Sequence, residues 1–427
     1  MDFRPSPAVE SLTERIEAFM DEHVYPVEGE VHRAIDAEVK PGVPYPEILV
    51  EIRSRAKEEG LWNLFLPDAE HGAGLGNWEY GMLCEVMGRS PVAAPMAFNC
   101  AAPDTGNMEI LAEHGSDEQK RDYLQPLLEG EIRSCFSMTE PEVSGADPRT
   151  LQTRAELRDG EWVINGHKWF TSGANGAAFA IAMVVTDPDA HPYARASMIL
   201  VPTDAPGFEL VRNVSVMGHD EGPGHCEIRY EDCRVPEANL LGERGAGFVI
   251  AQDRLGPGRI HHCMRAIGTA ERAIEMMCDR ANTREAWDGP LADKQFVQEF
   301  IASSRMEVDQ ARLLTLYAAW MMDTEGKRRA RHAISQIKVV AANMVMNVLD
   351  RAIQVHGALG MSDDTPLAGM WRFMRMLRVA DGPDEVHKMV IARRELNRAA
   401  KRSEGGGEGS DGDRPAPASA EATTAST

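Results

Sequence analysis

The sequence has little positive charge for its length. Its 427 residues include 45 Lys and Arg against 67 Asp and Glu, which gives a formal net charge of -22. Proteins that bind nucleic acid without regard to base sequence depend on clustered Lys and Arg. The charge deficit therefore argues against a nucleic-acid-binding protein, although it leaves room for a local basic patch around a phosphorylated ligand.

Cysteines are also few and scattered. The sequence contains seven, an odd number, and none are spaced as C-x-x-C. This pattern indicates neither a disulfide framework nor a zinc site. We expect reduced thiols that pack as small apolar side chains, and no bound metal.

Long apolar runs are missing as well. No stretch reaches the roughly 20 apolar residues that a membrane span needs. The N-terminal segment, MDFRPSPAVESLTERIEAF, has no apolar run like that of a signal peptide. From these features we expect a cytoplasmic protein that does not enter a membrane.

The chain divides into four regions of different texture. Residues 1–132 show apolar residues at helical spacing, 133–246 show short β-rich runs between turn residues, and 247–402 show long helical patterns again. Residues 403–427 are acidic and rich in Gly, Ser, Pro and Ala, so they lack the apolar surface that offsets the entropy of ordering. We therefore expect two helical domains flanking a β domain, followed by a disordered tail.

Two apolar stripes in the third of these domains have the period of a helix face. We expect both to be core rather than a cofactor site, because such stripes usually are. Their members are Leu313, Leu314, Tyr317, Trp320 and Met321 in one stripe, and Ile334, Ile337, Ala341, Met344 and Val348 in the other.

Two motifs in the β region carry chemistry. CFSMTEPEVSGAD begins at Cys135, and its small and hydroxyl residues with backbone donors can lie against a polar, electron-accepting ring. NGHKWFTSG begins at Asn165, and the period of a strand predicts that Trp169 and Thr171 share one face. Taken alone, Trp169 fits a core indole as well as a neighbour of a flavin.

These motifs, together with VMGHDEGPGHCEIRYEDCRVPEANLLGERGAGF at 216–248, resemble the acyl-CoA dehydrogenase family. The family signatures are similar to xxTEPxxGSD and KxWITNG. The resemblance implies an α+β fold with an N-terminal helical domain, a central β-barrel-like domain and a C-terminal four-helix bundle, and it implies FAD as cofactor. It further implies that the isoalloxazine ring contacts Met138, Thr139, Trp169 and Thr171. EVSGAD is one residue longer than the usual spacing and has Ala146 where serine is common, so Ser144 is the alternative substrate contact.

Two further motifs resemble family segments that bind FAD. REAWDGPLADKQ is similar to RxxFGxxLxxxQ, with which family members reach the FAD of a neighbouring subunit, and Asp288 replaces its glycine. QVHGALG is similar to QxxGGxG, and its alanine is tolerable if that residue keeps a negative φ. The resemblance thus implies a homodimer or homotetramer and these cofactor residues: Arg284, Trp287, Gln295, Gln354, Gly357 and Ala358.

The last motif places a carboxylate where the family has its catalytic base. RMLRVADGPDEVHKMVIARREL aligns Asp381 with the usual glutamate and is similar to a subgroup with an aspartate base, the animal family members ten and eleven. Some members instead carry a glutamate before the arginine that matches Arg259, but this chain has Gly258 there. Without the resemblance, the residues alone favour Asp381 as only a turn residue and Asp384 as a helix N-cap, since Asp is common at both positions.

The resemblance implies a reaction. Asp381 would remove the α-proton of an acyl-CoA thioester as general base while flavin N5 accepts the β-hydride, giving the trans-2-enoyl-CoA. An electron-transferring flavoprotein would reoxidise the flavin. Further implied contacts are Pro383 and Glu385 with FAD, and Ser144, Ala146, Arg259 and Gly382 with substrate.

Alternative interpretations stay open. A nitroalkane oxidase-like flavin oxidase of the same fold also uses an aspartate base, and a non-catalytic acyl-CoA- or flavin-binding assembly factor would explain aspartate in place of glutamate. An acyl-CoA oxidase is expected less, since those enzymes typically carry a further C-terminal domain. His261 and His262 diverge by about 100° on a helix, so we expect packing or substrate-pocket residues rather than a metal site.

Overall fold

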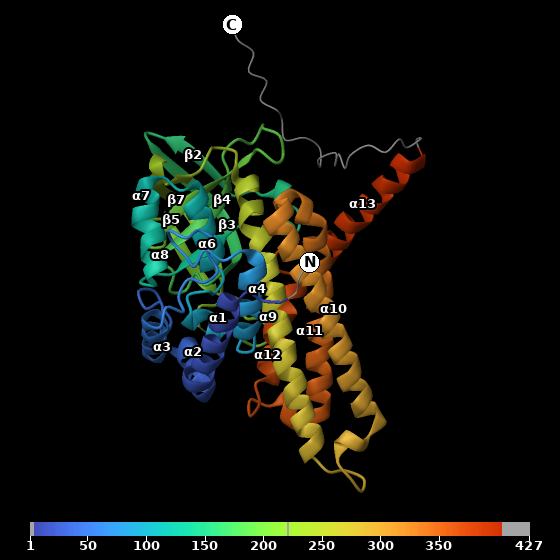
Figure 1. Ribbon diagram of the computed structural model, residues 1–427. Coiled ribbons are helices and arrows are strands. Elements are labelled where there is room, and N and C mark those ends of the chain that lie inside the picture. Colours follow the sequence, from blue (N-terminus) through green and yellow to red (C-terminus); the bar gives the residue numbers. More distant parts are fainter. Residues whose placement is uncertain (1–3, 220–221, 404–427) are drawn as a thin grey trace.

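The computed structural model describes residues 4–219 and 222–403. Helices form the first part of the chain, strands the second and long helices the third (Figure 1). The tail expected at 403–427 lies outside the described residues, except that the last helix ends at Ser403. Within the described part, every helix is too short or too polar to cross a membrane.

The N-terminal part consists of short helices that cap themselves locally. Ser6 accepts a hydrogen bond from the Val9 amide ahead of Pro7, and Ser116 and Gln119 form a capping box. Their apolar faces, including Ile16 on the first helix, enter the main core. The helices are α1 (Pro7–Phe19), α2 (Glu28–Glu38), α3 (Glu47–Glu58), α4 (Asn77–Gly88), α5 (Ala93–Ala97), α6 (Asp104–His114), α7 (Asp117–Gln119) and α8 (Gln125–Glu129).

The middle part is an eight-stranded sheet with the order β6-β7-β3-β2-β4-β5-β8, in which β1 pairs in parallel with β4. The central strand β4 is buried throughout and divides its side chains between two cores, as the period of a strand requires. Phe179, Ile181, Met183 and Val185 join the main core, whereas Ala180, Ala182 and Val184 join the core within the β domain. The sheet is therefore packed on both faces.

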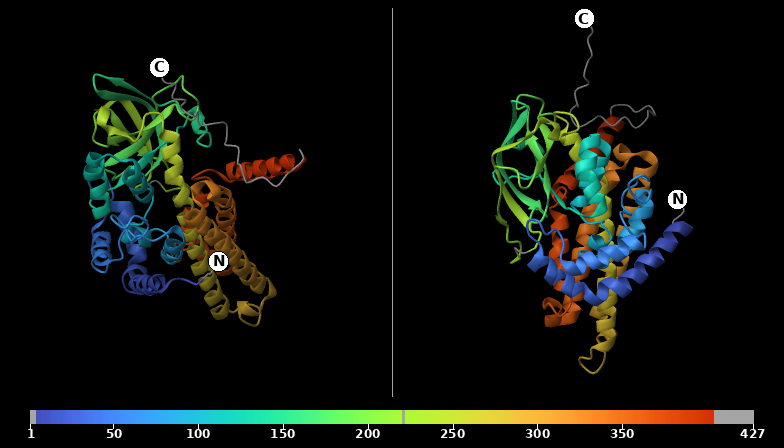
Figure 2. Two further views of the ribbon diagram at one scale, coloured as in Figure 1. Left: turned by 45° about the horizontal axis from the view of Figure 1, so that its top comes forward. Right: turned by 90° about the vertical axis from the view of Figure 1, so that its left-hand side faces the viewer.

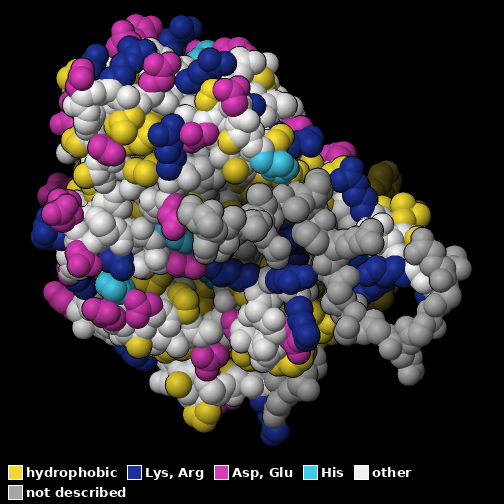
Figure 3. Space-filling model, turned by 90° about the horizontal axis from the view of Figure 1, so that it is seen from above, with side chains coloured by type: hydrophobic (Ala, Val, Ile, Leu, Met, Phe, Trp, Pro, Cys, Tyr) yellow, Lys and Arg dark blue, Asp and Glu magenta, His cyan; other side chains and the backbone are white. Residues whose placement is uncertain are grey.

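The strands are β1 (Ser134–Ser137), β2 (Arg154–Arg158), β3 (Glu161–Ser172), β4 (Phe179–Val185), β5 (Ala196–Pro202), β6 (Phe208–Asn213), β7 (His225–Pro236) and β8 (Leu240–Leu241). Seen from above, acidic and basic side chains are interspersed over the β domain (Figure 3).

The C-terminal part is built on three long helices, α9 (Gly247–Thr283), α10 (Gln295–Glu325) and α11 (Lys327–His356). They run side by side, followed by α12 (Leu367–Arg375) and by α13 (Asp384–Ser403), which projects away from the bundle (Figures 1 and 2). The chain thus has the expected helical, sheet and helical order.

One of the two predicted core stripes is exposed in part. The α11 stripe is buried along its length, but on α10 the side chains of Leu313 and Tyr317 are 51% and 40% exposed. A core stripe and an interface stripe have the same helical period, so the pattern could not separate them. The assignment of the whole first stripe to the core was wrong.

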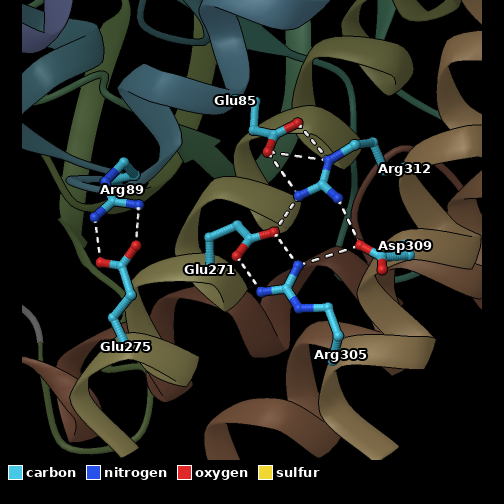
Figure 4. A network of polar contacts seen from close by, with 7 residues as sticks. All are labelled: Glu85, Arg89, Glu271, Glu275, Arg305, Asp309 and Arg312. Atoms are coloured by element: carbon cyan, nitrogen blue, oxygen red, sulfur yellow. Dashed lines mark hydrogen bonds and ion pairs between the residues drawn. The ribbon is translucent and has the colours of Figure 1, made fainter. Parts of the chain in front are cut away.

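Two glycines let α4 lie directly against α9. A Cβ atom at Gly268 would stand 1.8 Å from the Glu85 carbonyl oxygen, and one at Gly88 would stand 2.4 Å from the Arg265 carbonyl oxygen. Beside this crossing, ion pairs join α4, α9 and α10 (Figure 4). Arg312 contacts both Glu85 and Glu271, at 2.9 Å to Glu85. The junction fixes the direction of α9, which carries three residues of the candidate site.

Candidate active site

Asp381 lies in a short turn between η8 (Met376–Arg378) and α13. Its φ is +55° and that of Gly382 is +94°. The left-handed region is costly for most side chains, but aspartate tolerates it better than most. Asp384 is buried at the start of α13 and accepts hydrogen bonds from Arg378 Nε (2.9 Å) and Asn343 Nδ2 (3.1 Å). Both aspartates therefore occupy the turn and helix-start positions that the simpler interpretation expects.

The carboxylate of Asp381 does not take part in that turn. Its Oδ2 lies 3.5 Å from Nε2 of His262, on α9, and both side chains are mostly buried. The backbone carbonyl oxygen of Asp381 accepts a hydrogen bond from Arg259 Nε at 3.0 Å and lies 3.2 Å from His387 Nε2. The turn is thus held between α9 and α13, and its carboxylate points toward α9.

Positive charge surrounds this carboxylate. Burial by itself raises the pKa of Asp381, but the neighbouring His262, Lys338 and Arg259 side chains outweigh burial and hold that pKa below its ordinary value. Burial lowers the pKa of His262 to about 3, so its imidazole is neutral at pH 7. The lasting contributions therefore come from Lys338 and from the guanidinium groups of Arg259 and Arg254.

Arg254 connects this group of residues to the other two domains. Its Nε donates to Asn107 Oδ1 at 2.9 Å and its Nη2 to the Pro103 carbonyl oxygen at 3.3 Å. Its guanidinium carbon lies 4.1 Å from the centre of the Phe136 ring on β1. Because Arg254 also acts electrostatically on Asp381, α6, β1 and the Asp381 turn meet around this one side chain.

The side chains of the adjacent His261 and His262 point in different directions, as helix geometry predicts. His261 is buried and packs edge-on against the Tyr80 ring, with centroids 4.7 Å apart. His262 faces Asp381 instead. The sequence interpretation as packing or pocket residues fits both, but it could not tell which histidine was which.

On the β domain, a buried lysine holds the first motif against β3. Lys168 is 0% exposed, and its Nζ donates to Glu140 Oε1 at 2.9 Å and to the carbonyl oxygens of Met138 and Met183 at 2.8 Å. Burial lowers the pKa of Lys168 to about 8. The Trp169 amide donates to the Thr139 carbonyl oxygen at 3.0 Å. Met138 and Thr139 are therefore fixed by their backbone to β3.

A β-bulge interrupts β3 where the second motif lies. The three residue steps from Lys168 to Thr171 on β3 are paired with only two steps on β7, from Ile228 to Cys226. The φ of Phe170, within the bulge, is +48°. Lys168 and Thr171 are both fully buried, whereas Trp169 is half-buried against Phe170. The regular alternation on which the shared face of Trp169 and Thr171 was predicted does not hold here.

The loop after Thr139 folds back over it. A Cβ atom at Gly145 would stand 2.7 Å from Thr139 Cγ2, so the loop approaches as closely as glycine allows. Ser144 and Ala146, the two candidate substrate contacts, are exposed on either side of this glycine.

Most of the remaining cofactor candidates lie at the ends of the long helices and are solvent-exposed. Arg284 directly follows α9, Gln295 begins α10, Gln354 lies near the end of α11, and Gly357 and Ala358 begin η7 (Gly357–Met361). The α9–α10 connection is at the end of the bundle away from α13 (Figure 1). The chain therefore does not bring this set together with Asp381.

That connection carries nearly uncovered aromatic side chains. Trp287 is 92% exposed and Phe296 83% exposed. Asp288, which stands for the family's glycine, has a φ of +63° and so adopts the left-handed conformation that glycine favours. At the next motif, Gly357 has a φ of +67°, whereas Ala358 is not among the residues with positive φ, as its substitution for glycine requires. Pro383 and Glu385 are near Asp381, half-buried and exposed respectively.

Several residues of the site were not identified from the sequence. Lys338 interrupts the apolar α11 stripe, and a charge at a core position is itself a signal. Lys168 directly precedes Trp169, whereas the lysine of the KxWITNG pattern stands two residues before its tryptophan, so the motif as matched did not identify it. Arg254 and His387 carry no sequence signal that we recognise, because only the tertiary fold brings them to Asp381.

Comparison with known proteins matches all three parts of the chain. Three family models match: acyl-CoA dehydrogenase N-terminal domain at 6–131, middle domain at 135–233 and C-terminal domain at 245–396. FadE2 of Mycobacterium tuberculosis, assigned as an acyl-CoA dehydrogenase, is 50% identical over 400 residues, which cover 93% of this chain and 98% of that protein. Acyl-CoA dehydrogenase family member 10 of Mus musculus is 48% identical over 93% of this chain, which spans only 38% of that longer protein. A solved structure assigned as an acyl-CoA dehydrogenase, from Mycobacterium abscessus, is 46% identical with a TM-score of 0.88 and covers 93% of this chain and 100% of its own.

Proposed function

Because the chain belongs to the acyl-CoA dehydrogenase family, we propose that it oxidises an acyl-CoA thioester to the trans-2-enoyl-CoA, with Asp381 as general base. The observation that carries this proposal is the placement of one buried carboxylate among Lys338, Arg259 and Arg254. These charges favour the ionised form, which is the form that accepts a proton. The simpler turn interpretation gives no reason for this charged surrounding.

FAD fits the residues that this chain offers, and when bound it would accept the hydride from the β-carbon of the substrate. Met138, Thr139 and Trp169 supply a hydroxyl, an indole and a rigid backbone for the isoalloxazine ring. Thr171 is fully buried and its hydroxyl donates to Ser137 Oγ, so its proposed part is to support these residues. Their rigidity comes from Lys168 and from the Trp169–Thr139 backbone hydrogen bond. Pro383 and Glu385, which follow Asp381 closely in the chain, are proposed as further contacts with FAD.

Substrate is held from the same turn. We assign the backbone N–H of Asp381 as a donor to the thioester carbonyl, which makes the α-proton more acidic. Arg259 acts on the base rather than on substrate alone, because its Nε is committed to the Asp381 carbonyl oxygen. Gly382, Ser144 and Ala146 remain the candidate substrate contacts. When substrate excludes water, the Asp381 carboxylate becomes a stronger base than it is in the open site.

The cofactor site is proposed to be completed by a second subunit of a homodimer or homotetramer. Arg284, Trp287, Gln295, Gln354, Gly357 and Ala358 lie away from Asp381, and their exposure in the single chain supports a role across an interface. A permanently charged guanidinium and a glycine amide suit a pyrophosphate. Trp287 and Phe296 leave a large apolar area uncovered, which is typical of an interface.

Three further assignments belong to this proposal. Domain boundaries at 132/133 and 246/247 are supported by the start of β1 at Ser134 and of α9 at Gly247. An electron-transferring flavoprotein is the proposed electron acceptor, on the family resemblance. A cytoplasmic location is supported by the seven cysteines, all of which are free thiols, as in reducing compartments.

An anaerobic titration of the FAD-loaded protein tests the reaction. Butyryl-, octanoyl-, palmitoyl- and branched acyl-CoAs are added while flavin absorbance is followed, for the native chain and for Asp381→Asn. We expect at least one acyl-CoA to bleach the native flavin, and the variant to bleach at least about 10²–10⁴-fold more slowly with FAD still bound. Failure of every acyl-CoA to bleach the flavin would favour an assembly factor. Rapid reoxidation by oxygen would favour a flavin oxidase, and near-native bleaching by Asp381→Asn would reject Asp381 as the base.

A further inference from the structure

The imidazole of His262 is aimed at the carboxylate of Asp381. Its Nε2 lies 3.5 Å from Oδ2, which is longer than an ordinary N–H···O bond of about 2.9 Å. Hydrogen bonds at such sites are often long before substrate closes them. The neighbouring His261 points the other way, onto Tyr80, so the arrangement is specific to one histidine.

The second ring nitrogen of His262 determines where its proton is. Nδ1 lies 3.1 Å from Nη2 of Arg265, one helical turn further along α9. A guanidinium group can only donate hydrogen bonds, so Nδ1 must present its lone pair. The neutral ring then carries its proton on Nε2, the atom that faces Asp381. Neither the other tautomer nor the cation fits, since each would place an N–H against the guanidinium.

Arg265 is itself fixed, which makes this orientation a property of the fold. Its side chain is buried, and Nη1 donates to the Cys100 carbonyl oxygen at 3.4 Å. Its backbone lies at the close crossing of α4 and α9, where Gly88 leaves no room for a side chain. Arg265 therefore connects the N-terminal domain to His262 through buried contacts.

The charged groups around Asp381 have other main partners. Lys338, from α11, donates to the Leu377 carbonyl oxygen at 2.5 Å, and Arg254, from α9, donates to Asn107. Arg259 and His387, from α9 and α13, contact the backbone carbonyl of Asp381 rather than its carboxylate. They supply charge or hold the turn, whereas the imidazole faces one carboxylate oxygen.

We propose that His262 is a positioning residue that donates its Nε2–H to Oδ2 of Asp381 and leaves Oδ1 to take the substrate α-proton. This inference rests on the proposed function of Asp381 as the base. The donor stabilises the ionised carboxylate and selects one rotamer of it. In this arrangement His262 is not a proton relay, because its only free lone pair already faces Arg265.

Three variants of the FAD-loaded enzyme test this role through the pH dependence of kcat/KM, measured with the acyl-CoA that bleaches the flavin fastest. His262→Phe keeps a ring but removes the donor, so the acid limb should move up by about one pH unit as the carboxylate loses stabilisation. His262→Gln carries a donor nitrogen the same number of bonds from Cβ and should bring the limb back. His261→Phe is the matched control, since His261 Nε2 has no partner and the limb should not move.

A spectroscopic readout does not depend on turnover. In holoenzyme labelled with ¹⁵N-histidine, the signals lost in His262→Phe should show Nε2 protonated and Nδ1 unprotonated at pH 7. An Nδ1-protonated tautomer, or an acid limb in His262→Phe identical to that of the native enzyme, would overturn the proposal. If Asp381→Asn keeps near-native turnover, the proposed function itself fails. Loss of turnover in Asp381→Asn with an unmoved limb in His262→Phe rejects only the role of His262.

Discussion

Arg259 Nε donates a hydrogen bond to the backbone carbonyl oxygen of Asp381 over 3.0 Å, across 122 residues of sequence. The turn that carries Asp381 has a left-handed φ, and His387 contacts the same oxygen from α13. A conformation of this kind persists only when its surroundings hold it. The position of the carboxylate therefore depends on a contact between α9 and the turn.

Replacing that arginine should misplace the base. In Arg259→Gln we expect FAD to remain bound and kcat to fall by about 100-fold, the cost typical of a shift of about 1 Å at a reacting group. Single-turnover bleaching of the flavin measures the effect directly. Arg121→Gln is a matched control, because Arg121 is an exposed residue paired only with neighbouring Asp122. Equal rates in the two variants would show that the hydrogen bond does not position Asp381.

The charge of Lys338 should set the acid limit of activity. The pKa of Asp381 lies below its ordinary value although burial opposes this, and Lys338 is one of the groups responsible. The active form is the carboxylate, so activity persists above that pKa and is lost as pH falls through it. In Lys338→Met the pKa of Asp381 rises, and the acid limb of kcat/KM should move to higher pH. An unchanged limb in a folded, FAD-loaded variant would contradict the assignment.

The order of domains was readable from the sequence because each region has its own hydrophobic period. Asp381 and Arg259 could be identified from the sequence because each lies in a motif with fixed local spacing. Arg254 was not, because only tertiary contacts bring it to Asp381, and Lys338 was marked only as a charge at a core position, with nothing to connect it to Asp381. The exposure of Leu313 and Tyr317 could not be predicted either, because apolar residues recur with the same period on a helix face that packs in a core and on one that lies at an interface. Nor could the β-bulge between Lys168 and Thr171 be predicted, because the alternation of side chains along a strand does not show where an extra residue is inserted.

The buried pair of Lys168 and Glu140 should control both stability and flavin binding. Both side chains are almost fully buried, and Glu140 also accepts the amides of Gln152 and Thr153. Glu140→Gln leaves a buried ammonium group without its counter-charge, which typically costs about 3–5 kcal/mol. Because Lys168 holds the Met138 carbonyl oxygen, we also expect weaker FAD binding. Denaturant unfolding of the apoprotein and fluorescence titration with FAD measure the two effects.

A double variant separates the charge from the packing. Adding Lys168→Met to Glu140→Gln removes the unpaired charge and should recover part of the lost stability. FAD binding should stay weak, because Lys168→Met removes the donor to the Met138 carbonyl oxygen. Full recovery of FAD binding in the double variant would show that Lys168 has no part in shaping the flavin surface.

The exposed end of the bundle should govern assembly and cofactor retention together. Trp287→Asp places a charge on a side chain that is 92% exposed in the single chain. If this face is a subunit interface, the variant should sediment as a smaller species and lose FAD. Val50→Asp, on α3, is the control, because Val50 is likewise exposed and is not among the cofactor residues. A stable monomer that retains a full complement of FAD would disprove the shared site.

Small residues next to Asp381 predict a preference for bulky acyl chains. Many family members have a tyrosine directly before the base, but this chain has Ala380, and a Cβ atom at Gly258 would meet nothing within 4 Å. Met374, one of two side chains that could fill the space, is buried in the main core, and Trp371 packs against that core. We therefore expect kcat/KM for long or branched acyl-CoAs to exceed that for butyryl-CoA by about tenfold or more.

Filling the space should reverse that preference. Ala380→Tyr or Gly258→Val adds volume beside the reacting carbons, so each should lower kcat/KM for palmitoyl- and branched acyl-CoAs more than for butyryl-CoA. Gly29→Val, on α2, adds the same valine where the space near Asp381 is not altered, and it should leave the ratio unchanged. An optimum at butyryl-CoA in the native enzyme would show that other side chains already occupy the space, and chain length would then be set elsewhere in the site.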